Sequence, residues 1–472
     1  MDARNLQELA AACGGELRGG SPTLAIRRVT TDSRDARPGD LFIALAGERF
    51  DGHDYLATAA LQGVTAAMIA RARVSALPAT LPGILVDDPR RAFGRMAAAY
   101  RREFDLPVVC VAGSNGKTTT KELIGAVLGA AFPTLKSVAS FNNNVGVPST
   151  LMRLESRHRA AVLEAGTNHP GELAPLVRLI APRIGVITSI GREHLEYFGT
   201  LEGVVNEEGW LAELLPPAEQ GGTLFLPGSM PEAAALVRRT HARVIRVGFG
   251  EGNDWQAGIR GMDWSGTTFA VRSPDRAWNG EYTMILPGRH SVVNALLALA
   301  VARELGLDSL AAQEGLAAFQ PAPQRLSLVA GAGVHLLDDT YNANADSMLA
   351  ALQTLSDLPC AGRRVAVLGD MAELGDHAEA AHAEVGRSAA RLGVEAVFAV
   401  GRFAAVTAAA AGGGRGRAYA DVGAAAAAVI HFVKSGDAVL VKASRSSRLE
   451  RLVAALMKQM ELRESADLPE VI

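Results

Sequence analysis

Short apolar runs alternate along this chain with longer stretches whose apolar residues recur at helical spacing. From about residue 107 to 318 the chain follows this pattern, and the runs at 106–112, 160–165 and 184–188 have the length and largely apolar composition of buried parallel strands. The stretches between them are helical in pattern, and residues 291–305 are typical of a strongly apolar helix. This β/α alternation predicts a parallel sheet covered by helices.

The alternation restarts after residues 319–324, a segment with two prolines that we interpret as a linker. Four further strands are predicted beyond it, at 334–337, 364–368, 396–400 and 438–441. Their spacing leaves room for helices between them. This part of the chain therefore predicts a second doubly wound α/β domain.

The first 87 or so residues mix short helical and strand patterns with turn signals. At 472 residues the chain is too long for a single hydrophobic core. We therefore predict an α/β protein of three domains, with boundaries at 1–87, 88–318 and 319–472.

Composition and charge exclude several classes of function. The formal net charge of −3 lacks the basic excess of a nucleic-acid-binding protein. No uninterrupted apolar run approaches the roughly 20 residues of a membrane-spanning helix, and the polar N-terminus does not resemble a secretory signal. Cys13, Cys110 and Cys360 lie far apart in apolar surroundings, which favours buried side chains over a disulfide framework or a metal site. We expect a cytoplasmic protein that neither binds nucleic acid nor inserts into a membrane.

The clearest chemical signal is a glycine-containing turn between the strand at 106–112 and a helical stretch at 122–128. A strand, a glycine turn, Lys-Thr and a helix form the arrangement that cradles a nucleoside triphosphate, with Lys117 on the phosphates and Thr118 on Mg²⁺. The alternative is a turn that merely joins strand to helix. Lysine is rare here, since Lys117 is one of six among 47 basic residues, so we predict ATP or GTP binding. The candidate contacts are Gly113, Ser114, Asn115, Gly116, Lys117, Thr118 and Thr119.

Polar residues at the ends of other predicted strands point to the same crevice. Glu164 ends an apolar strand, where a carboxylate is well placed to hold Mg²⁺ beside a nucleotide. His194 follows the strand at 184–188. Taken singly, Glu164 could cap a helix and His194 could be structural, but their joint placement favours function. Polar clusters at 338–348 and 442–447 likewise follow strands of the last domain and predict its binding face.

These residues match a known family. The motifs that carry the resemblance lie at 31–34, 38–45, 49–54, 113–119, 142–148, 164, 168–169, 194–196, 338–344, 369–375 and 440–442. Over essentially its whole length the chain resembles the ATP-dependent Mur ligases. The runs at 341–344 and 369–375 resemble those of the members that add D-alanyl-D-alanine to UDP-N-acetylmuramoyl-tripeptide.

The resemblance implies an N-terminal domain for the UDP sugar, a central ATPase and a Rossmann-like third domain that closes over the nucleotide. It implies that Lys117 and Thr118 bind phosphates and Mg²⁺, and that Glu164 and His194 are metal ligands. Asn294 would lie near the adenine, and Arg325 and Asp339 would contact ATP from the third domain. The implied substrate residues are Ser33, Arg34, Arg49, Asp51, Gly52, His53, Asn142, Asn143, Asn168, His169, Tyr341, Asn342, Asn344, Lys442, Ser444 and Arg445.

The implied reaction is amide-bond formation through an acyl phosphate, with ATP and Mg²⁺ as cofactors and a monomer as the working unit. Two alternatives remain open: a sibling ligase that adds a single amino acid, and a phosphate-loop NTPase or binding module without ligase activity. A weakened paralogue is a third, because the chain departs from the family pattern.

The main departure is Glu208, which stands where the family usually carries a carbamylated lysine. No lysine occurs between Lys136 and Lys434, which excludes a lysine carbamate here. We interpret Glu208 as its replacement, acting through a water or a shifted helix. Asn144, Ala345 and Ala443 stand where the family more often has Glu, Pro and Gly.

Overall fold

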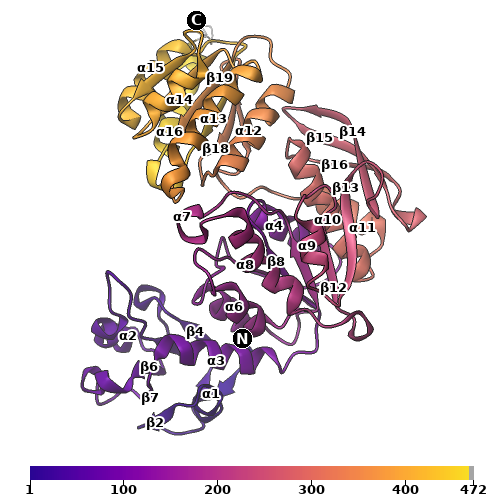
Figure 1. The fold of residues 1–472 in the computed structure, drawn as a ribbon. Coiled ribbons are helices and arrows are strands. Elements are labelled where there is room, and N and C mark those ends of the chain that lie inside the picture. The colour runs from indigo at the N-terminus through magenta and orange to yellow at the C-terminus, as the bar shows by residue number, and fades with distance from the viewer. Residues whose placement is uncertain (467–472) are drawn as a thin grey trace, which may run out of the picture.

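The computed structural model describes residues 1–466, which form three α/β lobes in chain order (Figure 1). We call residues 1–101 the first lobe, 102–318 the central lobe and 319–466 the third lobe. Each lobe is built around its own main sheet. The first and third lobes lie at opposite ends of the central one (Figure 1). The predicted α/β class and the three-part architecture are thereby confirmed.

The first lobe has a five-stranded sheet of order β2-β7-β6-β5-β4, parallel except for β2. Helix α3 starts with Asp88 as N-cap and packs on α1 as well as on α5 and α6 of the central lobe. Because α3 contacts both lobes, the boundary near residue 87 stays a prediction. The elements are β1 Arg4–Asn5, α1 Leu6–Cys13, β2 Glu16–Arg18, β3 Ala25–Ile26, β4 Arg28–Thr30, η1 Ser33–Asp35, β5 Asp40–Ile43, η2 Gly52–Tyr55, α2 Leu56–Leu61, β6 Ala66–Ala70, η3 Arg71–Ala76, β7 Gly83–Val86 and α3 Pro89–Arg101.

The central lobe has a nine-stranded sheet of order β16-β15-β14-β13-β12-β11-β8-β10-β9. Strand β8 lies between β10 and β11. The connection after β8 leads to β9 on one side of it, and the connection after β10 leads to β11 on the other side, which opens a crevice at the carboxyl end of β8. The elements are β8 Val108–Ala112, α4 Lys117–Gly129, β9 Thr134–Lys136, α5 Gly146–Leu151, β10 Ala160–Glu164, α6 Leu173–Ile180, β11 Ile184–Ile187, α7 Leu195–Phe198, α8 Leu201–Glu213, η4 Ala218–Gln220, β12 Thr223–Pro227, α9 Ala233–Val237, β13 Arg243–Phe249, β14 Trp255–Asp263, β15 Gly266–Arg272, η5 Arg276–Trp278, β16 Gly280–Met284, α10 Arg289–Glu304 and α11 Ser309–Ala317.

The predicted β/α alternation is wrong for one stretch of this lobe. Strands β14, β15 and β16 follow each other as antiparallel hairpins with no α-helix between them. Four of the nine residues of β14 are exposed and one is buried, so the strand lacks the continuous apolar run by which buried parallel strands are recognised.

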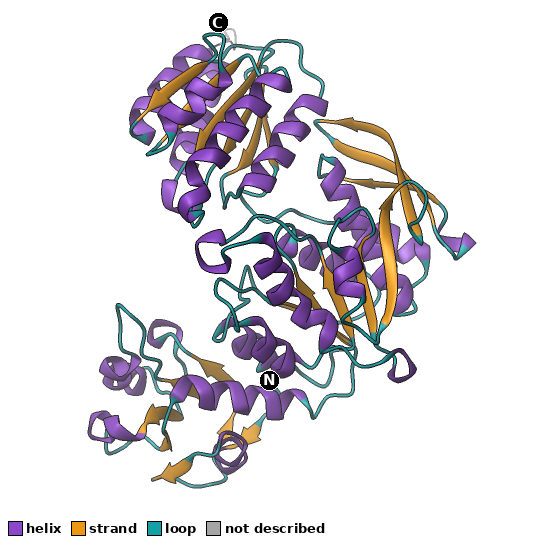
Figure 2. Cartoon of the chain, in the orientation of Figure 1, coloured by secondary structure: helices purple, strands orange, loops and turns teal. Residues whose placement is uncertain are grey.

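The third lobe has a six-stranded sheet of order β17-β18-β22-β19-β20-β21, parallel except for β17. Its four predicted strands are confirmed as β18, β19, β20 and β22, and helices cover both faces of the sheet (Figure 2). The elements are β17 Ser327–Gly331, β18 Val334–Asp339, α12 Ala345–Asp357, β19 Arg364–Gly369, η6 Gly375–His377, α13 Ala378–Arg391, β20 Ala396–Val400, α14 Ala404–Ala411, β21 Gly416–Tyr419, α15 Val422–Phe432, β22 Ala438–Lys442, η7 Arg445–Ser447 and α16 Glu450–Ala466.

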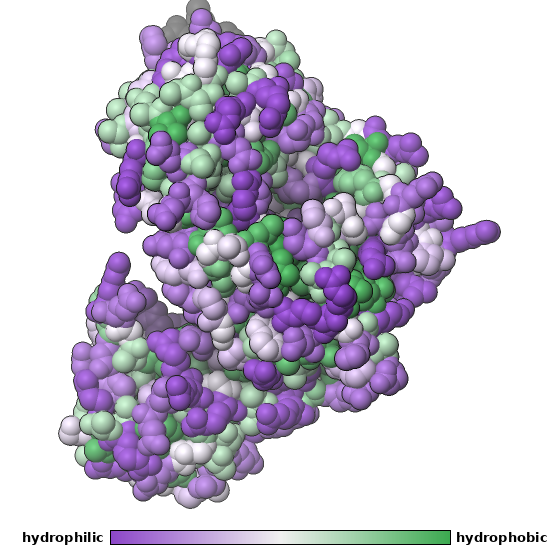
Figure 3. Space-filling view, viewed as in Figure 1, coloured by the Kyte–Doolittle hydropathy of each residue, from purple (hydrophilic) through white to green (hydrophobic). Residues whose placement is uncertain are grey.

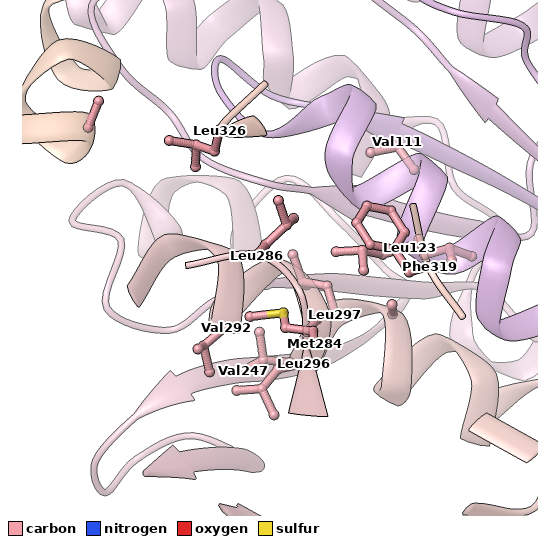
Figure 4. Close-up of a cluster of buried hydrophobic side chains, with 14 of the residues drawn as sticks. Val111, Leu123, Val247, Met284, Leu286, Val292, Leu296, Leu297, Phe319 and Leu326 are labelled. Atoms are coloured by element: carbon pink, nitrogen blue, oxygen red, sulfur yellow. The ribbon is translucent and has the colours of Figure 1, made fainter. Parts of the chain in front are cut away.

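The core of the central lobe supports the start of α4. Val111 of β8, Leu123 of α4 and Leu296 and Leu297 of α10 belong to one buried cluster (Figure 4). The cluster continues into the third lobe through Leu337 and Leu352 and their neighbours. The carboxyl end of β8 is therefore anchored on packed side chains from two lobes. In the described residues 1–466, no helix is both long and apolar enough to cross a membrane.

Candidate functional site

The glycine turn at 113–116 lies between the end of β8 and the start of α4, as predicted. Gly113 and Gly116 have φ of +111° and +84°, a backbone region that favours glycine. A Cβ on Gly113 would lie 2.7 Å from the carbonyl oxygen of Ser189, so the loop also needs glycine for space. The first residues of α4 present their N–H groups at this turn, which makes it suited to phosphate.

Lys117 folds back onto this loop. Its Nζ donates to the carbonyl of Gly113 at 2.5 Å and lies 3.5 Å from Oε2 of Glu193. Burial opposes its charge, but the carboxylates of Glu193, Glu208 and Glu164 outweigh burial and raise the pKa of Lys117. The lysine is therefore a permanent cation at the mouth of the loop.

Glu164, at the end of β10, faces the start of α4. Its Oε2 accepts a hydrogen bond from Oγ1 of Thr118 at 2.9 Å, and its Oε1 accepts one from Nδ2 of Asn142 at 2.8 Å. A buried carboxylate beside a threonine hydroxyl at a phosphate loop fits Mg²⁺, which takes few protein oxygens and completes its shell with phosphate and water. Within residues 1–466, no group of three or more His, Cys, Asp or Glu residues is arranged to hold a metal by itself.

His194 connects two lobes in this structure. Its Nδ1 lies 2.5 Å from Oε2 of Glu373 in the third lobe, and its Nε2 lies 3.8 Å from Glu193. The hydrogen bond to His194 lowers the pKa of Glu373, so this carboxylate stays ionised. The predicted role of His194 as a metal ligand stays a prediction.

Glu208 lies on α8 behind the phosphate loop and is fully buried. Its Oε2 accepts a hydrogen bond from the N–H of Gly113 at 2.7 Å, and its Oε1 has no partner. Burial raises the pKa of Glu208 to about 8, although the neighbouring Lys117 acts in the opposite direction. Gly113 is thus held on both sides, by Glu208 at its N–H and by Lys117 at its carbonyl.

The polar cluster that follows β18 faces the loop from the third lobe. Nζ of Lys442 lies 2.5 Å from Oδ2 of Asp339 and donates to the carbonyl of Asn342. The guanidinium of Arg325 stacks 3.9 Å from the ring centroid of Tyr341. Asn344 caps α12 and donates to Oδ1 of Asn115 across the lobes at 2.9 Å.

Most of these groups line one cleft between the central and third lobes, with a volume of about 1010 Å³. The space-filling view shows the surface recessed where the two lobes meet (Figure 3). The cleft brings together these predicted site residues: Ser114, Asn115, Gly116, Lys117, Thr118, Thr119, Asn142, Asn143, Glu164, Asn168, His194, Asn294, Arg325, Asp339, Tyr341, Asn342, Asn344, Lys442 and Ser444. Gly113, His169, Glu208 and Arg445 do not line it. The ring of His169 packs at a tilt against that of Tyr197, and Arg445 donates to Gln324.

The predicted residues of the first lobe also lie outside the cleft. His53 is 4% exposed, and both its ring nitrogens are engaged within the lobe. Its Nε2 accepts the N–H of Ala70 at 3.0 Å, so its Nδ1 carries the proton and donates to Asp51. Gly52 packs against the backbone at Leu45. Ser33 is buried, whereas Arg34 and Arg49 are exposed. The assignment of these residues to a UDP pocket stays a prediction.

Several residues of the cleft were missed by the sequence analysis. Glu193 lines it, and its buried Oε1 has no partner. Arg192 does not line the cleft but joins the two lobes beside it, through ion pairs of 2.6 Å with Asp346 and with Glu384 of the third lobe. Ser140 also lines the cleft. Glu193 and Arg192 directly precede His194, and Ser140 precedes the Asn142–Asn143 pair, so proximity to recognised motifs was the available signal.

Comparison with known proteins places this geometry in a family. Three family models cover most of the chain: "Mur ligase family, catalytic domain" matches residues 25–101, "Mur ligase middle domain" residues 111–302, and "Mur ligase, glutamate ligase domain" residues 324–445.

Relatives of known activity and structure agree with the models. The UDP-N-acetylmuramoyl-tripeptide--D-alanyl-D-alanine ligase of Escherichia coli K12 is 37% identical over 97% of this chain and 99% of its own length. The enzyme of the same name from Bacillus subtilis is 35% identical over 92% of this chain and 93% of its own.

Among solved structures, a MurF from Acinetobacter baumannii superposes with a TM-score of 0.88 at 32% identity, covering 97% of this chain and 99% of that one. The MurF ligase from Thermotoga maritima in complex with ADP has a TM-score of 0.79 at 26% identity, covering 93% and 98%. The chain belongs to the Mur ligase family.

Proposed function

We propose that this chain is an ATP-dependent, ADP-forming ligase that joins D-alanyl-D-alanine to UDP-N-acetylmuramoyl-tripeptide in peptidoglycan precursor synthesis. The observation that carries the proposal is the single cleft in which the phosphate loop and Glu164 face Arg325, Tyr341 and Lys442. The identity to ligases of this activity over nearly the whole chain supports it.

In this proposal the phosphate loop receives ATP. The N–H groups at the start of α4 and the cation of Lys117 hold the phosphates, with Lys117 exchanging its bond to Gly113 for phosphate oxygens. Thr118 and Glu164 would hold Mg²⁺, which supplies charge neutralisation when bound. Asn294 faces Gly116 from α10, near the expected nucleotide.

Amide formation from a carboxylate needs activation. The tripeptide carboxylate oxygen bonds to the γ-phosphorus of ATP while the bond from that phosphorus to the β-γ bridging oxygen breaks, giving an acyl phosphate and ADP. The amine of the dipeptide then bonds to the acyl carbon, its surplus proton is lost, and inorganic phosphate leaves. The chain's own contribution is positioning and positive charge, from Lys117 and from Arg325 on the opposite wall.

The first lobe is the proposed site of the UDP moiety, with Arg34 and Arg49 as its exposed cations. Because Asp51 and His53 bond to each other and to their own lobe, their part is to shape the loop that carries Arg49. Both walls of the ATP cleft come from one chain, which is what the proposed monomer requires. The cytoplasmic location stays a prediction.

Glu208 remains the proposed replacement for the family's lysine carbamate. Its carboxyl group binds Gly113 of the loop, so a role toward Mg²⁺ requires a bridging water or a shift of α8. If the variant Glu208→Ala kept its turnover and its Mg²⁺ dependence, this role would be excluded.

The decisive experiment measures phosphate release from ATP and Mg²⁺ with UDP-N-acetylmuramoyl-tripeptide, with and without D-alanyl-D-alanine, together with the product mass. Release that needs both substrates and a mass gain of one dipeptide supports the ligase. Release without ligation supports an NTPase. Ligation that fails with the dipeptide but occurs when a single amino acid and the matching shorter UDP-linked acceptor are supplied instead supports a sibling ligase.

A further inference from the structure

Ser140 lies in the loop between β9 and α5 and lines the ATP cleft. Its Oγ lies within hydrogen-bond distance of three groups from three separate parts of the chain. These are Oγ1 of Thr118 at 3.3 Å, the hydroxyl of Tyr341 at 2.9 Å and Nη2 of Arg325 at 3.3 Å. Thr118 belongs to the phosphate loop helix, whereas Arg325 and Tyr341 belong to the third lobe.

Hydrogen-bond chemistry fixes the direction of each contact. A serine hydroxyl offers one donor and two acceptor lone pairs, and a guanidinium only donates. The Thr118 hydrogen goes to Glu164, so Ser140 donates to Thr118. Its lone pairs then accept from Arg325 and Tyr341. The Ser140 hydroxyl is therefore fully used, and the order of bonds runs from Tyr341 to Ser140, then to Thr118, then to Glu164.

The loop that carries Ser140 is fixed in position by buried contacts. Lys121 of α4 is fully buried, and its Nζ donates to the carbonyls of Ser137 and Ala139 at 2.9 and 2.6 Å. Oγ of Ser137 accepts the N–H of Glu164. Ala139 has φ of +47°, a left-handed conformation that turns the chain directly before Ser140. The hydroxyl is thus held at a set position between the two lobes.

We propose that Ser140 is a positioning residue of the ligation reaction, whose hydroxyl sets the third lobe over the phosphate loop. The inference rests on the proposed function, since it assigns Ser140 to the same cleft. Arg325 is the cation of the third lobe that Ser140 holds, and the pair of Arg325 and Tyr341 is already stacked. Ser140 therefore aligns a preassembled unit with Thr118 and Glu164 rather than building it.

Removing the hydroxyl leaves the nucleotide contacts of the phosphate loop in place. It removes the hydrogen bonds that fix the orientation of the third lobe relative to that loop. The expected effect is on kcat, because the reacting groups come from two lobes and need both in register. One hydrogen bond that holds a charged group corresponds to about a tenfold loss. The affinity for ATP measured without the other substrates should change by less than about twofold, since Lys117 and the loop N–H groups remain.

The test compares Ser140→Ala, Tyr341→Phe and the double variant in the full ligation assay, with ATP affinity measured separately by titration. Each single variant should lose about tenfold in kcat, and the double variant should lose little more, because both changes cut the same link. Ser140→Cys, nearly equal in size but a weak hydrogen-bonding group, should behave like Ser140→Ala. The matched control is Ser356→Ala, which removes a serine hydroxyl that bonds only within the third lobe, to Leu392.

Three results overturn the inference while the wild-type protein still ligates. These are an unchanged kcat for Ser140→Ala, losses in the double variant that multiply as independent effects do, and full activity of Ser140→Cys. A loss of kcat also overturns it, in favour of a folding role, if Ser140→Ala and Ser140→Cys both melt at a lower temperature and by the same amount. A wild-type protein that makes no amide product overturns the proposed function instead, and this inference with it.

Discussion

The buried carboxyl group of Glu208 makes the stability of the protein depend on pH in a way that one substitution removes. Burial raises its pKa from 4.5 to about 8 in the folded chain. In the unfolded chain the same group has its ordinary pKa. The folded state therefore binds a proton that the unfolded state releases, and the stability it contributes is present below pH 4.5 and lost as pH rises toward 8.

The variant Glu208→Gln has a neutral side chain of the same shape and keeps an acceptor for the N–H of Gly113. Its free energy of unfolding lacks the pH dependence that Glu208 contributes. The contributions of the other titrating groups are shared by both proteins and cancel in the comparison with the wild type. One pKa unit corresponds to about 1.4 kcal/mol, so between pH 5.5 and 7.5 the variant should gain about 3 kcal/mol relative to the wild type.

The assay is thermal or urea unfolding of both proteins at pH 5.5, 6.5, 7.5 and 8.5 in EDTA, following the transition of the central lobe. The variant's advantage should widen up to about pH 8 and then level off. A stability difference that stays constant over this range would mean that Glu208 is ionised in the folded protein, and the reasoning from its burial would be wrong. Glu207, buried on the same helix but bonded to the N–H groups of Gly171 and Leu173, supplies the control Glu207→Gln.

Three further changes have expected outcomes. Lys117→Ala removes the cation of the phosphate loop and should lower kcat about 10²–10³-fold, measured as ADP release; a loss below tenfold would contradict the assignment. His53→Ala removes a buried, doubly bonded ring and should lower stability by about 2–4 kcal/mol in urea unfolding, whereas a stable variant with weakened UDP-substrate binding would identify His53 as a ligand contact. Arg192→Ala removes partly exposed ion pairs to Asp346 and Glu384 and should raise KM for ATP about two- to fivefold; unchanged KM would show that these pairs do not hold the lobes.

The parts of the site that the sequence predicted are those encoded locally. Gly113 to Thr119 form a contiguous turn whose geometry follows from glycines and the helix that starts beside them. Glu164 was singled out because it ends an apolar strand of the same predicted sheet that His194 follows. The buried strands were predicted from local composition, since a largely apolar run of five residues suffices to identify them.

Contacts between the lobes were not predictable in this way. Arg192 and Asp346 are separated by 154 residues, and Ser140 and Tyr341 by 201. Such pairs follow from how the lobes dock, which no local pattern records. The contacts of His53 were not predictable for a related reason: the sequence does not show that both its ring nitrogens are engaged within the lobe, and its predicted substrate contact stays a prediction. Strands β14 to β16 were missed because half-exposed antiparallel strands carry a weaker apolar signal.

Lys121 shows how a buried residue that contacts no substrate can control the cleft. Its side chain is fully buried. Its Nζ donates to the carbonyls of Ser137 and Ala139 and lies 2.7 Å from Oε1 of Glu122. The variant Lys121→Met keeps most of the volume but leaves two carbonyl groups and the carboxylate without this donor. Each unmet buried group costs about 1–3 kcal/mol, so we expect a loss of about 3 kcal/mol or more.

The expected result is therefore a lower melting temperature together with new proteolytic cleavage in the loop at 137–144, because Lys121 fixes that loop. Lys136→Met is the matched control: Lys136 pairs with the same Glu122, but its side chain is 47% exposed, and its loss should change stability by less than about 1 kcal/mol. Equal effects of the two variants would assign the stabilisation to the charge of Glu122 rather than to the loop. A stable, uncleaved Lys121→Met would show instead that the loop holds its own shape and that Ser140 needs no support from α4.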